Sequence, residues 1–176
     1  MSIQVNLEDL ILQKARAEEA EAIWSIIKQA IDKRKEEGSN QWQDGYPNLG
    51  VIQRDIELGY GYVHVDANGE VYGYLALIFE IEPAYEIIEG KWLSDQPYGV
   101  VHRIAVSQAN YVKGQASKML KEVEELCKER QVYSLRVDTN FDNVGMLRVF
   151  EKLGYTYCGE VYFRGGARRA YEKVLN

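Results

Sequence analysis

The sequence predicts one α/β domain over residues 1–176, built on a central sheet that is mostly antiparallel but contains a parallel pair of strands at its centre, with helices flanking the sheet. Two patterns lead to this prediction. A buried strand, an amphipathic helix and a second strand follow one another over residues 99–137, and such a unit makes a right-handed crossover that places its two strands parallel. Hairpin-like strand pairs precede and follow this unit, and hairpin strands run antiparallel.

The first part of the chain predicts a strand followed by two helices. Residues 10–12 form a short apolar strand, and apolar residues between 23 and 31 recur at helical spacing up to a stop at Gly38. Residues 39–49 have no periodicity and contain Gly45 and Pro47, so they are expected to form a loop. A second helix is expected at residues 51–58.

Residues 60–79 give the clearest local signal, a hairpin. Two apolar strands flank Asn68 and Gly69, and an Asn-Gly pair supplies the positive φ angles of a type I′ turn. His64 lies in the first of these strands and is expected at the surface. Residues 80–98 then carry five acidic side chains and two prolines, which predicts a long irregular excursion beside the sheet.

The remaining elements alternate between strands and helices. Residues 99–106 are apolar except for His102 and Arg103, as expected of the buried strand at the sheet centre. A helix over residues 116–127 and a strand over 133–137 follow. A further helix at residues 146–153 ends at Gly154, in the position of a C′ glycine. Two last strands, at residues 155–163 and 168–174, turn around Gly165 and Gly166 and could pair across a homodimer.

Composition and charge exclude several classes of protein. The net charge is −6 and the basic residues are scattered, which argues against a nucleic-acid backbone as the principal partner. Cys127 and Cys158 have a spacing that matches no metal site or redox pair, so no metal is expected. No apolar run approaches the roughly 20 residues of a membrane span. The N-terminus lacks a signal-peptide pattern, so a soluble, cytoplasmic protein is expected.

The turn at residues 113–117 has the features of a pyrophosphate site. A helix that begins just after a buried strand presents unpaired N–H groups and the positive end of its dipole. Gly114 and Ala116 let phosphates approach the backbone, Lys113 adds a charge, and the Ser117 hydroxyl can donate a further hydrogen bond. Taken alone, the turn is explained equally well as a tight structural connection. The two commonest nucleotide-binding strings, G-x-G-x-x-G and G-x-x-x-x-G-K-[ST], are absent.

Two sequence blocks in this region resemble the GNAT superfamily of N-acetyltransferases in their order and spacing. The blocks are Ile104-Ala105-Val106 followed by Tyr111-Val112-Lys113-Gly114-Gln115-Ala116, and Asn143-x-x-Met146-x-x-x-Phe150-x-x-Leu153-Gly154-Tyr155. The order of strands and helices on either side of these blocks also resembles that of the family. The resemblance implies a GNAT-like fold, acetyl-CoA as cosubstrate, and transfer of an acetyl group to a primary amine of a small molecule or peptide.

The resemblance also implies roles for individual residues. The backbone of Ile104, Ala105 and Val106 is expected to pair with the pantetheine arm and to bring the thioester carbonyl near a main-chain N–H. The pyrophosphate is expected on Tyr111, Val112, Lys113, Gly114, Gln115, Ala116 and Ser117. Asn140 and Asn143 match positions that contact the cofactor, and Phe150 is expected to line the arm.

Two positions depart from the family pattern. Tyr111 stands where the family usually has glutamine or arginine, which removes one phosphate donor. Phe150 stands where many relatives have a tyrosine that protonates the leaving thiolate, and phenylalanine has no proton to give. These departures keep open the alternative of a non-catalytic acyl-CoA-binding module or regulator.

The general base has three candidates. His102 lies two residues before Ile104, and an ordinary imidazole pKa of about 6.5 suits removal of a proton from an amine. A half-buried histidine bonded to a neighbouring backbone group explains His102 equally well. Glu80 and Glu82 are the competing bases, although a solvated strand end explains both. Trp42, Tyr46 and Trp92 fall in the two irregular segments expected to flank the acceptor, and loop packing is their more frequent explanation.

Overall fold

The computed structural model describes residues 4–164 and 166–176. The chain divides into two units, the first made of residues up to Ala76 with Arg103–Leu120, and the second of Leu77–His102 with Lys121–Asn176. Three elements contribute residues to both units: β3 (Val71–Ile78), β5 (Gly99–Val106) and α4 (Gln115–Glu129).

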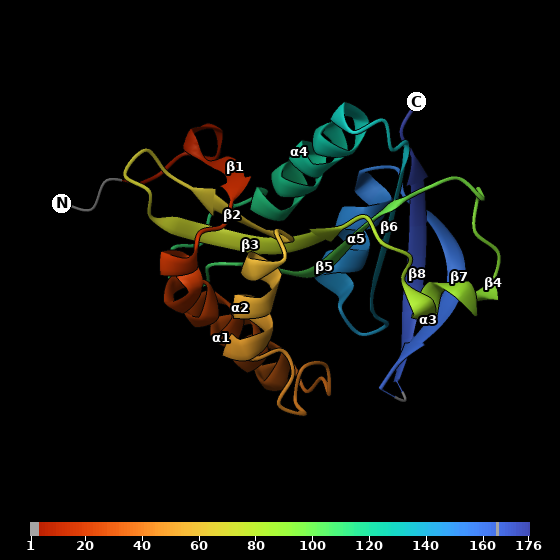
Figure 1. Cartoon of the computed structure of the whole chain (residues 1–176). Helices are drawn as coiled ribbons and strands as arrows, with labels where there is room; N and C mark the ends of the chain where they lie inside the picture. Colours follow the sequence, from red (N-terminus) through yellow and green to blue (C-terminus); the bar gives the residue numbers. More distant parts are fainter. Residues whose placement is uncertain (1–3, 165) are drawn as a thin grey trace. The chain divides into compact units, whose positions relative to one another are not determined.

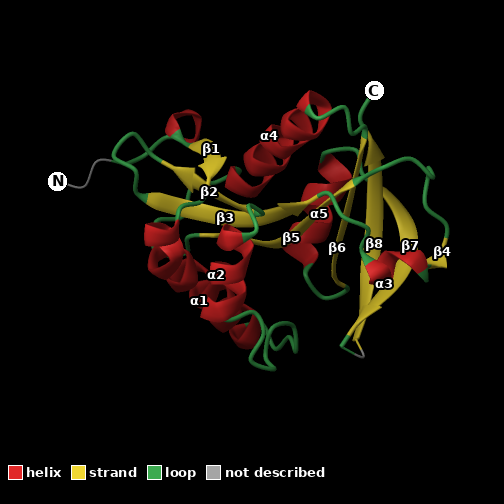
Figure 2. Ribbon diagram, viewed as in Figure 1, coloured by secondary structure: helices red, strands yellow, loops and turns green. Residues whose placement is uncertain are grey.

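The strands form one eight-stranded sheet in the order β1-β2-β3-β5-β6-β8-β7-β4 (Figure 1). β5 and β6 (Ser134–Asn140) pair in parallel, on either side of the crossover helix α4, and the sheet is otherwise mostly antiparallel. Figure 2 shows the strands together with the helices that connect them along the chain. The predicted fold class, a mixed α/β sheet with one parallel pair, is confirmed.

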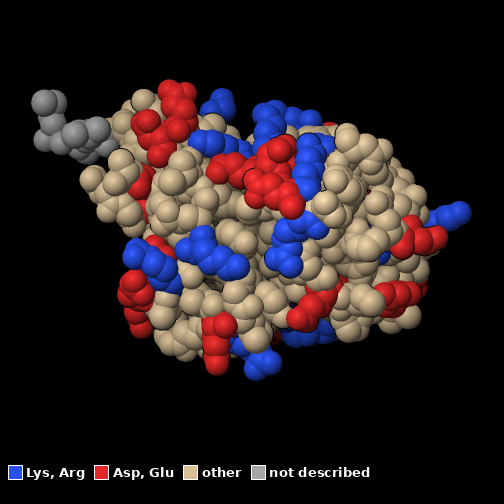
Figure 3. All heavy atoms as spheres, turned by 45° about the horizontal axis from the view of Figure 1, so that its top comes forward, with Lys and Arg blue, Asp and Glu red and all other residues tan. Residues whose placement is uncertain are grey.

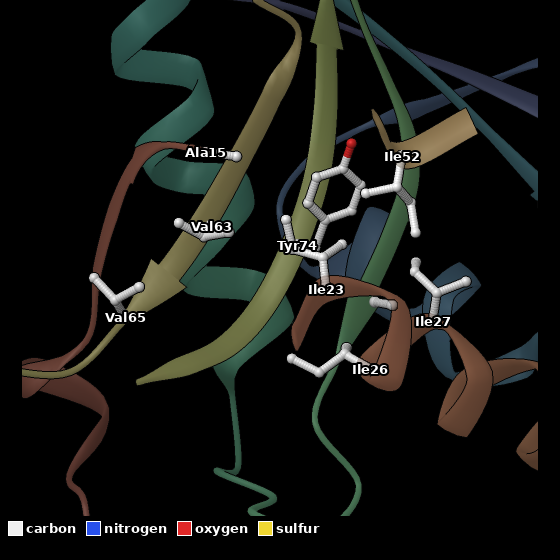
Figure 4. Close-up of a cluster of buried hydrophobic side chains, with 9 residues drawn as sticks. Ala15, Ile23, Ile26, Ile27, Ile52, Val63, Val65 and Tyr74 are labelled. Carbon is white, nitrogen blue, oxygen red and sulfur yellow. The ribbon is translucent and has the colours of Figure 1, made fainter. Parts of the chain in front are cut away.

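The first unit has its core between the sheet and two helices, α1 (Ala20–Glu36) and α2 (Leu49–Glu57). β1 (Ile11–Lys14) pairs antiparallel with β2 (Gly61–Val65). Figure 4 shows the ring of Tyr74 beside Ile23 and Ile52, with the hydroxyl directed away from the α1 side chains. The buried apolar residues of α1 and α2 recur at the helical spacing from which the two helices were predicted. A helix at a sheet surface is stabilised by burying one apolar stripe.

The turn between β2 and β3 is not the predicted type I′ turn. Gly69 has a φ of 80°, but Asn68 is not among the described residues with positive φ. The Asp66 carboxylate accepts hydrogen bonds from the N–H groups of Asn68 and Glu70, both at 2.9 Å, and Gly69 N–H donates to Asp66 O at 3.0 Å. The aspartate side chain therefore selects a wider turn in which only the glycine is left-handed.

The expectation that His64 is a surface residue is wrong, because its side chain is 0% exposed. Its neighbours Val63 and Val65 face the α1 and α2 cluster, so His64 points to the opposite face of β2. There it meets Gln115 of α4, whose Nε2 lies 3.1 Å from His64 Nδ1. Since helices cover both faces, alternation of polar and apolar residues along β2 does not mark a solvent face.

The second unit joins β6 to two long antiparallel strands, β7 (Thr156–Phe163) and β8 (Gly166–Val174), with α5 (Val144–Lys152) between β6 and β7 along the chain. Gly166 begins β8, and Gly165, the other residue of the predicted turn, lies outside the described residues.

The predicted excursion at residues 80–98 contains two short elements. They are α3 (Pro83–Glu86), which begins with proline at a first-turn position, and β4 (Glu89–Gly90), which pairs with β7. Trp92 packs against the core of this unit and donates from Nε1 to Tyr85 O at 2.8 Å, so its role is packing, the more frequent explanation.

Basic and acidic side chains are interspersed on the face that Figure 3 shows, without a broad patch of one sign. Within the described part of the chain, no helix combines the length and the apolar character that a membrane span requires.

Candidate active site

The turn that precedes α4, in the first unit, is where the sequence predicts a pyrophosphate site. Gly114 has a φ of 83°, which turns the chain into the helix. The first i→i−4 bond of the helix runs from Lys118 N–H to Gly114 O at 3.1 Å. The N–H groups of Ala116 and Ser117 precede that bond and belong to the unpaired first turn of a helix. The backbone here has the donors that an anion requires.

The side chains of this turn divide between solvent and interior. Tyr111 and Lys113 are exposed, whereas Gln115 is 1% exposed and directs its amide to His64. Gln115 N–H already donates to Val112 O at 3.3 Å. Phosphate contacts from this turn would therefore come from the backbone, the Lys113 charge and the Ser117 hydroxyl, and Gln115 serves chiefly to anchor the turn to β2.

Lys118, one turn further along α4, has a structural role. Its Nζ donates to Leu7 O at 2.9 Å and to Leu10 O at 2.6 Å, so its charge is engaged by the N-terminal segment. A Cβ added at Gly114 would lie 3.3 Å from Leu7 Cδ2. The N-terminal segment thus packs beneath the turn and fixes its backbone. This donor set fits a pyrophosphate.

A valine at position 114 is expected to raise the Kd for acetyl-CoA by about tenfold or more, a loss of at least about 1.4 kcal/mol. A side chain at a φ of 83° strains the backbone, and the added Cβ crowds Leu7. Isothermal titration calorimetry measures the change. Gly69→Val is the matched control, because Gly69 has a φ of 80° but lies in the β2–β3 turn. Equal affinity losses in both variants would contradict a phosphate site at Gly114.

Along β5, the predicted pantetheine-binding residues alternate in burial. Ala105 is 5% exposed and belongs to the core of the first unit, whereas Ile104 and Val106 are half-buried. The strand ends where Ser107 N–H donates to Tyr72 O at 2.8 Å. This alternation is what an extended strand produces, and it leaves the roles of the three residues as predictions.

His102, in the second unit, pairs with Glu82. Its Nε2 lies 3.2 Å from Glu82 Oε2, and the two side chains are 15% and 23% exposed. Glu82 is itself held: its N–H donates to the Tyr98 hydroxyl at 3.1 Å, and its Oε1 accepts from Ala84 N–H at 3.3 Å as the cap of α3. A carboxylate that orients an imidazole in this way is a frequent arrangement for a general base.

The parallel ladder between β5 and β6 ends just before His102. It joins Gly99 to Leu135 and Val100 to Arg136. His102 therefore lies two residues beyond the part of β5 that pairs with β6. Its ring has aromatic neighbours, Tyr85 at a centroid distance of 6.4 Å and Phe163, edge-on, at 6.0 Å. A partly exposed imidazole with apolar walls and one carboxylate partner results.

Glu80, the third candidate base, differs from Glu82 in its exposure. It is exposed, two residues beyond the end of β3. The structure brings Glu82 into contact with His102. The two glutamates differ in environment, because Glu80 is exposed and Glu82 is half-buried. Glu82 contacts the imidazole of His102. The sequence left open whether a histidine or a glutamate is the base, and the structure narrows this to which of these two contacting residues takes the proton from the amine.

Asp138 of β6 is a neighbour of this site that sequence reasoning missed. It accepts a hydrogen bond of 2.6 Å from the Tyr85 hydroxyl, and Arg168 Nη1 lies 3.9 Å from its other oxygen. Burial raises the pKa of Asp138 above its ordinary value, while the nearby charge of His102 opposes that shift. Burial also raises the pKa of Tyr85 well above its ordinary value, so its hydroxyl stays protonated. An aspartate within an otherwise buried strand is the signal that would have found it.

The second predicted block has local structural roles in the second unit. Asn140 donates from Nδ2 to Asp142 at 2.9 Å, and Asn143 caps α5 by accepting from Met146 N–H at 3.3 Å. Phe150 is 2% exposed, with its ring centroid 5.9 Å from that of Tyr155 and 5.2 Å from that of Tyr171. The aromatic packing holds Phe150 in the core. Contacts of these three residues with a cofactor stay predictions.

The chain is similar to known acetyltransferases in sequence and in fold. A model of the acetyltransferase (GNAT) family matches residues 19–155. The structure of a GNAT-family acetyltransferase from Streptococcus agalactiae 2603 is 37% identical, with a TM-score of 0.86, and the match covers 95% of this chain and 96% of that one. No curated protein matches the chain.

More distant structures share the fold. A GNAT-family acetyltransferase from Listeria monocytogenes 4b F2365 is 22% identical, with a TM-score of 0.75 over 94% of this chain and 95% of that one. Ard1 from Thermoplasma volcanium is 15% identical, with a TM-score of 0.68 over 96% and 99%. With a family model that spans most of the sequence, the chain belongs to the GNAT family of acetyltransferases and is an acyltransferase enzyme.

Proposed function

We propose that this chain transfers an acetyl group from acetyl-CoA to a primary amine of a small molecule or peptide, by direct attack and without a covalent enzyme intermediate or a metal. The observation that carries the proposal is the contact between His102 and Glu82. His102 lies on β5, two residues before Ile104. Membership of the acetyltransferase family supports the reaction class. The turn before α4 supports a cosubstrate that carries a pyrophosphate.

In this proposal His102 is the general base. With Nε2 carrying a hydrogen and donating it to Glu82 Oε2, Nδ1 holds the lone pair that removes a proton from the amine. The thioester of acetyl-CoA supplies an activated acyl carbon and a thiolate that leaves readily. The N–C bond forms and the C–S bond breaks, His102 keeps the amine proton, and the thiolate takes a proton from solvent because Phe150 has none to donate.

The chain's other predicted residues bind and orient the cosubstrate. The backbone of Ile104, Ala105 and Val106 pairs with the pantetheine arm, and the turn at residues 111–117 holds the pyrophosphate. Asn140, Asn143 and Phe150 contribute further contacts. The whole chain acts as one cytoplasmic N-acetyltransferase domain, and its last two strands could form a homodimer contact.

Two measurements test the proposal. Acetyl-CoA at 100 times its Kd should raise the free energy of unfolding by about 2.7 kcal/mol, seen as a rise in Tm of several degrees. The release of thiol in the presence of a panel of primary amines, including diamines, amino sugars and short peptides, should then reveal turnover. The absence of a Tm shift at millimolar acetyl-CoA would overturn the proposal.

The same pair of measurements separates a transferase from a non-catalytic acyl-CoA-binding protein. Phe150 favours the second candidate, because it is a buried phenylalanine at the position of the family's tyrosine acid. A Tm shift without thiol release from any amine in the panel would support that candidate. Gly114→Val serves as the control in the thermal measurement, because it should lose most of the shift.

A further inference from the structure

Arg103 occupies a conformation that β-strands do not ordinarily adopt. It lies in the middle of β5 with a φ of 56°, in the left-handed region. A side chain makes this region costly, and such a residue persists only where its surroundings hold it. The residues on either side of it are His102 and Ile104, the predicted base and the first residue of the predicted pantetheine-binding segment.

A buried carboxylate from α2 holds Arg103 at two points. Arg103 Nε donates to Asp55 Oδ2 at 2.9 Å, and Nη2 donates to Oδ1 at 2.7 Å, with the two side chains only 11% and 5% exposed. A planar guanidinium bound by both oxygens of a carboxylate is fixed in position and orientation. Asp55 therefore restrains the backbone of β5 through the Arg103 side chain.

Two tyrosine hydroxyls complete the network. Tyr74 of β3 donates to Asp55 Oδ2 at 2.6 Å, and Arg103 Nη1 donates to the Tyr46 hydroxyl at 2.5 Å. Burial raises the pKa of Tyr74, so its hydroxyl remains a donor at all working pH values. The network joins α2, β3, β5 and the segment between α1 and α2, all within the first unit.

The left-handed residue changes where the flanking peptide groups point. In a regular strand, successive N–H and C=O groups alternate between the two edges. A residue with positive φ rotates the peptide that follows it, as in a β-bulge, so the N–H of Ile104 leaves the regular alternation. The orientation of this N–H, and of the side chain of His102 before it, depends on keeping Arg103 left-handed.

Stability alone does not account for the Asp55–Arg103 pair. A buried ion pair is often replaceable by apolar residues of similar volume without loss of stability, because burying two charges offsets most of their attraction. For stability, a valine and a leucine could replace the Asp55–Arg103 pair. What these apolar residues could not supply is a directed restraint on the β5 backbone. Such a restraint is required at Arg103, because its left-handed conformation is strained.

We propose that Asp55 is a positioning residue of the acetyltransferase: it holds Arg103 in the left-handed conformation that orients His102 and the N–H of Ile104. This inference rests on the proposed function, since it concerns the two residues that the proposed reaction uses. Asp55 touches neither substrate in this scheme and acts only through Arg103. The alternative is that the network merely stabilises the fold.

Variants at position 103 separate positioning from stability. Asp55→Asn should lower kcat about tenfold or more, because small misplacements of reacting groups are costly. Asp55→Asn combined with Arg103→Gly removes the pair but leaves a residue that adopts positive φ freely. Asp55→Asn combined with Arg103→Ala removes the same contacts and differs from the first double variant by one methyl group.

The glycine double variant should recover kcat to within about threefold of the wild type, whereas the alanine double variant should stay about tenfold or more below it. Glycine is also expected to give the higher Tm of the two, because alanine at a φ of 56° strains the backbone. The value of kcat is therefore measured at a temperature well below the Tm of every variant, where all of them are folded and a difference in stability does not change the amount of active protein. If the two double variants are equally active at that temperature, the proposal is wrong.

A second readout does not depend on turnover. The Ile104 amide resonance of ligand-free protein should shift in Asp55→Asn and in the alanine double variant, and return towards its wild-type position in the glycine double variant. The Kd for acetyl-CoA should follow the same order. If the wild type releases no thiol with any amine, the proposed function fails, and these two measurements still decide the inference. An unchanged Ile104 resonance in Asp55→Asn would overturn it.

Discussion

Replacement of His102 by alanine is expected to lower kcat by about 10²–10⁴-fold, the usual contribution of a positioned general base. His102 is the imidazole that Glu82 holds at 3.2 Å, on the strand that leads into the predicted cosubstrate segment. The alanine variant keeps the backbone of β5 and leaves the turn before α4 untouched. The Kd for acetyl-CoA should therefore change by less than about threefold, equal to about 0.7 kcal/mol.

The pH dependence of kcat/KM tests the assignment more sharply. If His102 is the base, the acidic limb of the wild-type profile reports loss of the neutral imidazole, and that limb should disappear or move in His102→Ala. Glu82→Gln keeps a hydrogen-bond acceptor but removes the charge, so it should shift the limb with a smaller loss of kcat. Glu86→Gln, an exposed residue of α3, is the matched control and should leave the profile unchanged.

The outcome at Glu80 and Glu82 decides between the candidate bases. A loss in Glu80→Gln as large as that in His102→Ala would point to the exposed carboxylate instead. An unchanged profile in His102→Ala would remove histidine from the mechanism. The structure makes the combined His102 and Glu82 result the expected one, because those two side chains contact each other.

The sequence predicted the elements well where one periodic pattern sufficed. The strand at residues 99–106 coincides with β5, and the turn at Gly114 lies directly before α4. These segments succeed because local rules and the global fold agree: a buried strand has a continuous apolar run, and Gly114 supplies the positive φ that turns the chain into α4. The parallel pairing of β5 with β6 followed from the order of strand, helix and strand along the chain.

Local sequence patterns could not predict contacts between residues that are distant in the sequence. The burial of His64 depends on Gln115, which lies 51 positions away, and the Asp55–Arg103 pair joins residues 48 positions apart. The left-handed conformation of Arg103 has no sequence signal, since arginine is not a residue that favours positive φ. The predicted type of the β2–β3 turn was wrong for a local reason. The Asp66 side chain accepts hydrogen bonds from the turn backbone, and this competes with the preference of Asn-Gly for a type I′ turn.

Replacement of Glu172 by alanine is expected to reduce the free energy of unfolding by about 3–5 kcal/mol, as breaking one member of a buried ion pair does. Glu172 is 0% exposed and accepts four hydrogen bonds. The donors are Leu93 N–H, Ser94 Oγ, Ser134 Oγ and Arg136 Nε. Urea denaturation monitored by tryptophan fluorescence measures the loss.

The partner left behind sets the size of this effect. The Arg136 guanidinium stacks on Trp92 and Tyr98 at 4.2 and 4.0 Å, so it cannot move to solvent without disrupting both rings. Replacing Glu172 and Arg136 together by methionine should recover part of the stability, because no unpaired charge then remains. The recovery is incomplete because the donors at Leu93, Ser94 and Ser134 still lose their acceptor. A single Glu172→Ala loss below about 1 kcal/mol would show that Arg136 finds another partner or solvent, since exposed pairs contribute only that much.

Loss of Glu172 should also affect the site through Tyr98. Glu172 fixes the segment at Leu93 and Ser94, and further along that segment the Tyr98 hydroxyl accepts from the N–H of Glu82. Glu82 in turn orients His102, so a loosened segment weakens the hold on the base. In Glu172→Ala, measured below its unfolding transition, kcat should therefore fall while the Kd for acetyl-CoA is retained. A parallel loss of both would instead indicate general unfolding, because cosubstrate binding by the turn before α4 does not depend on residues 92–98.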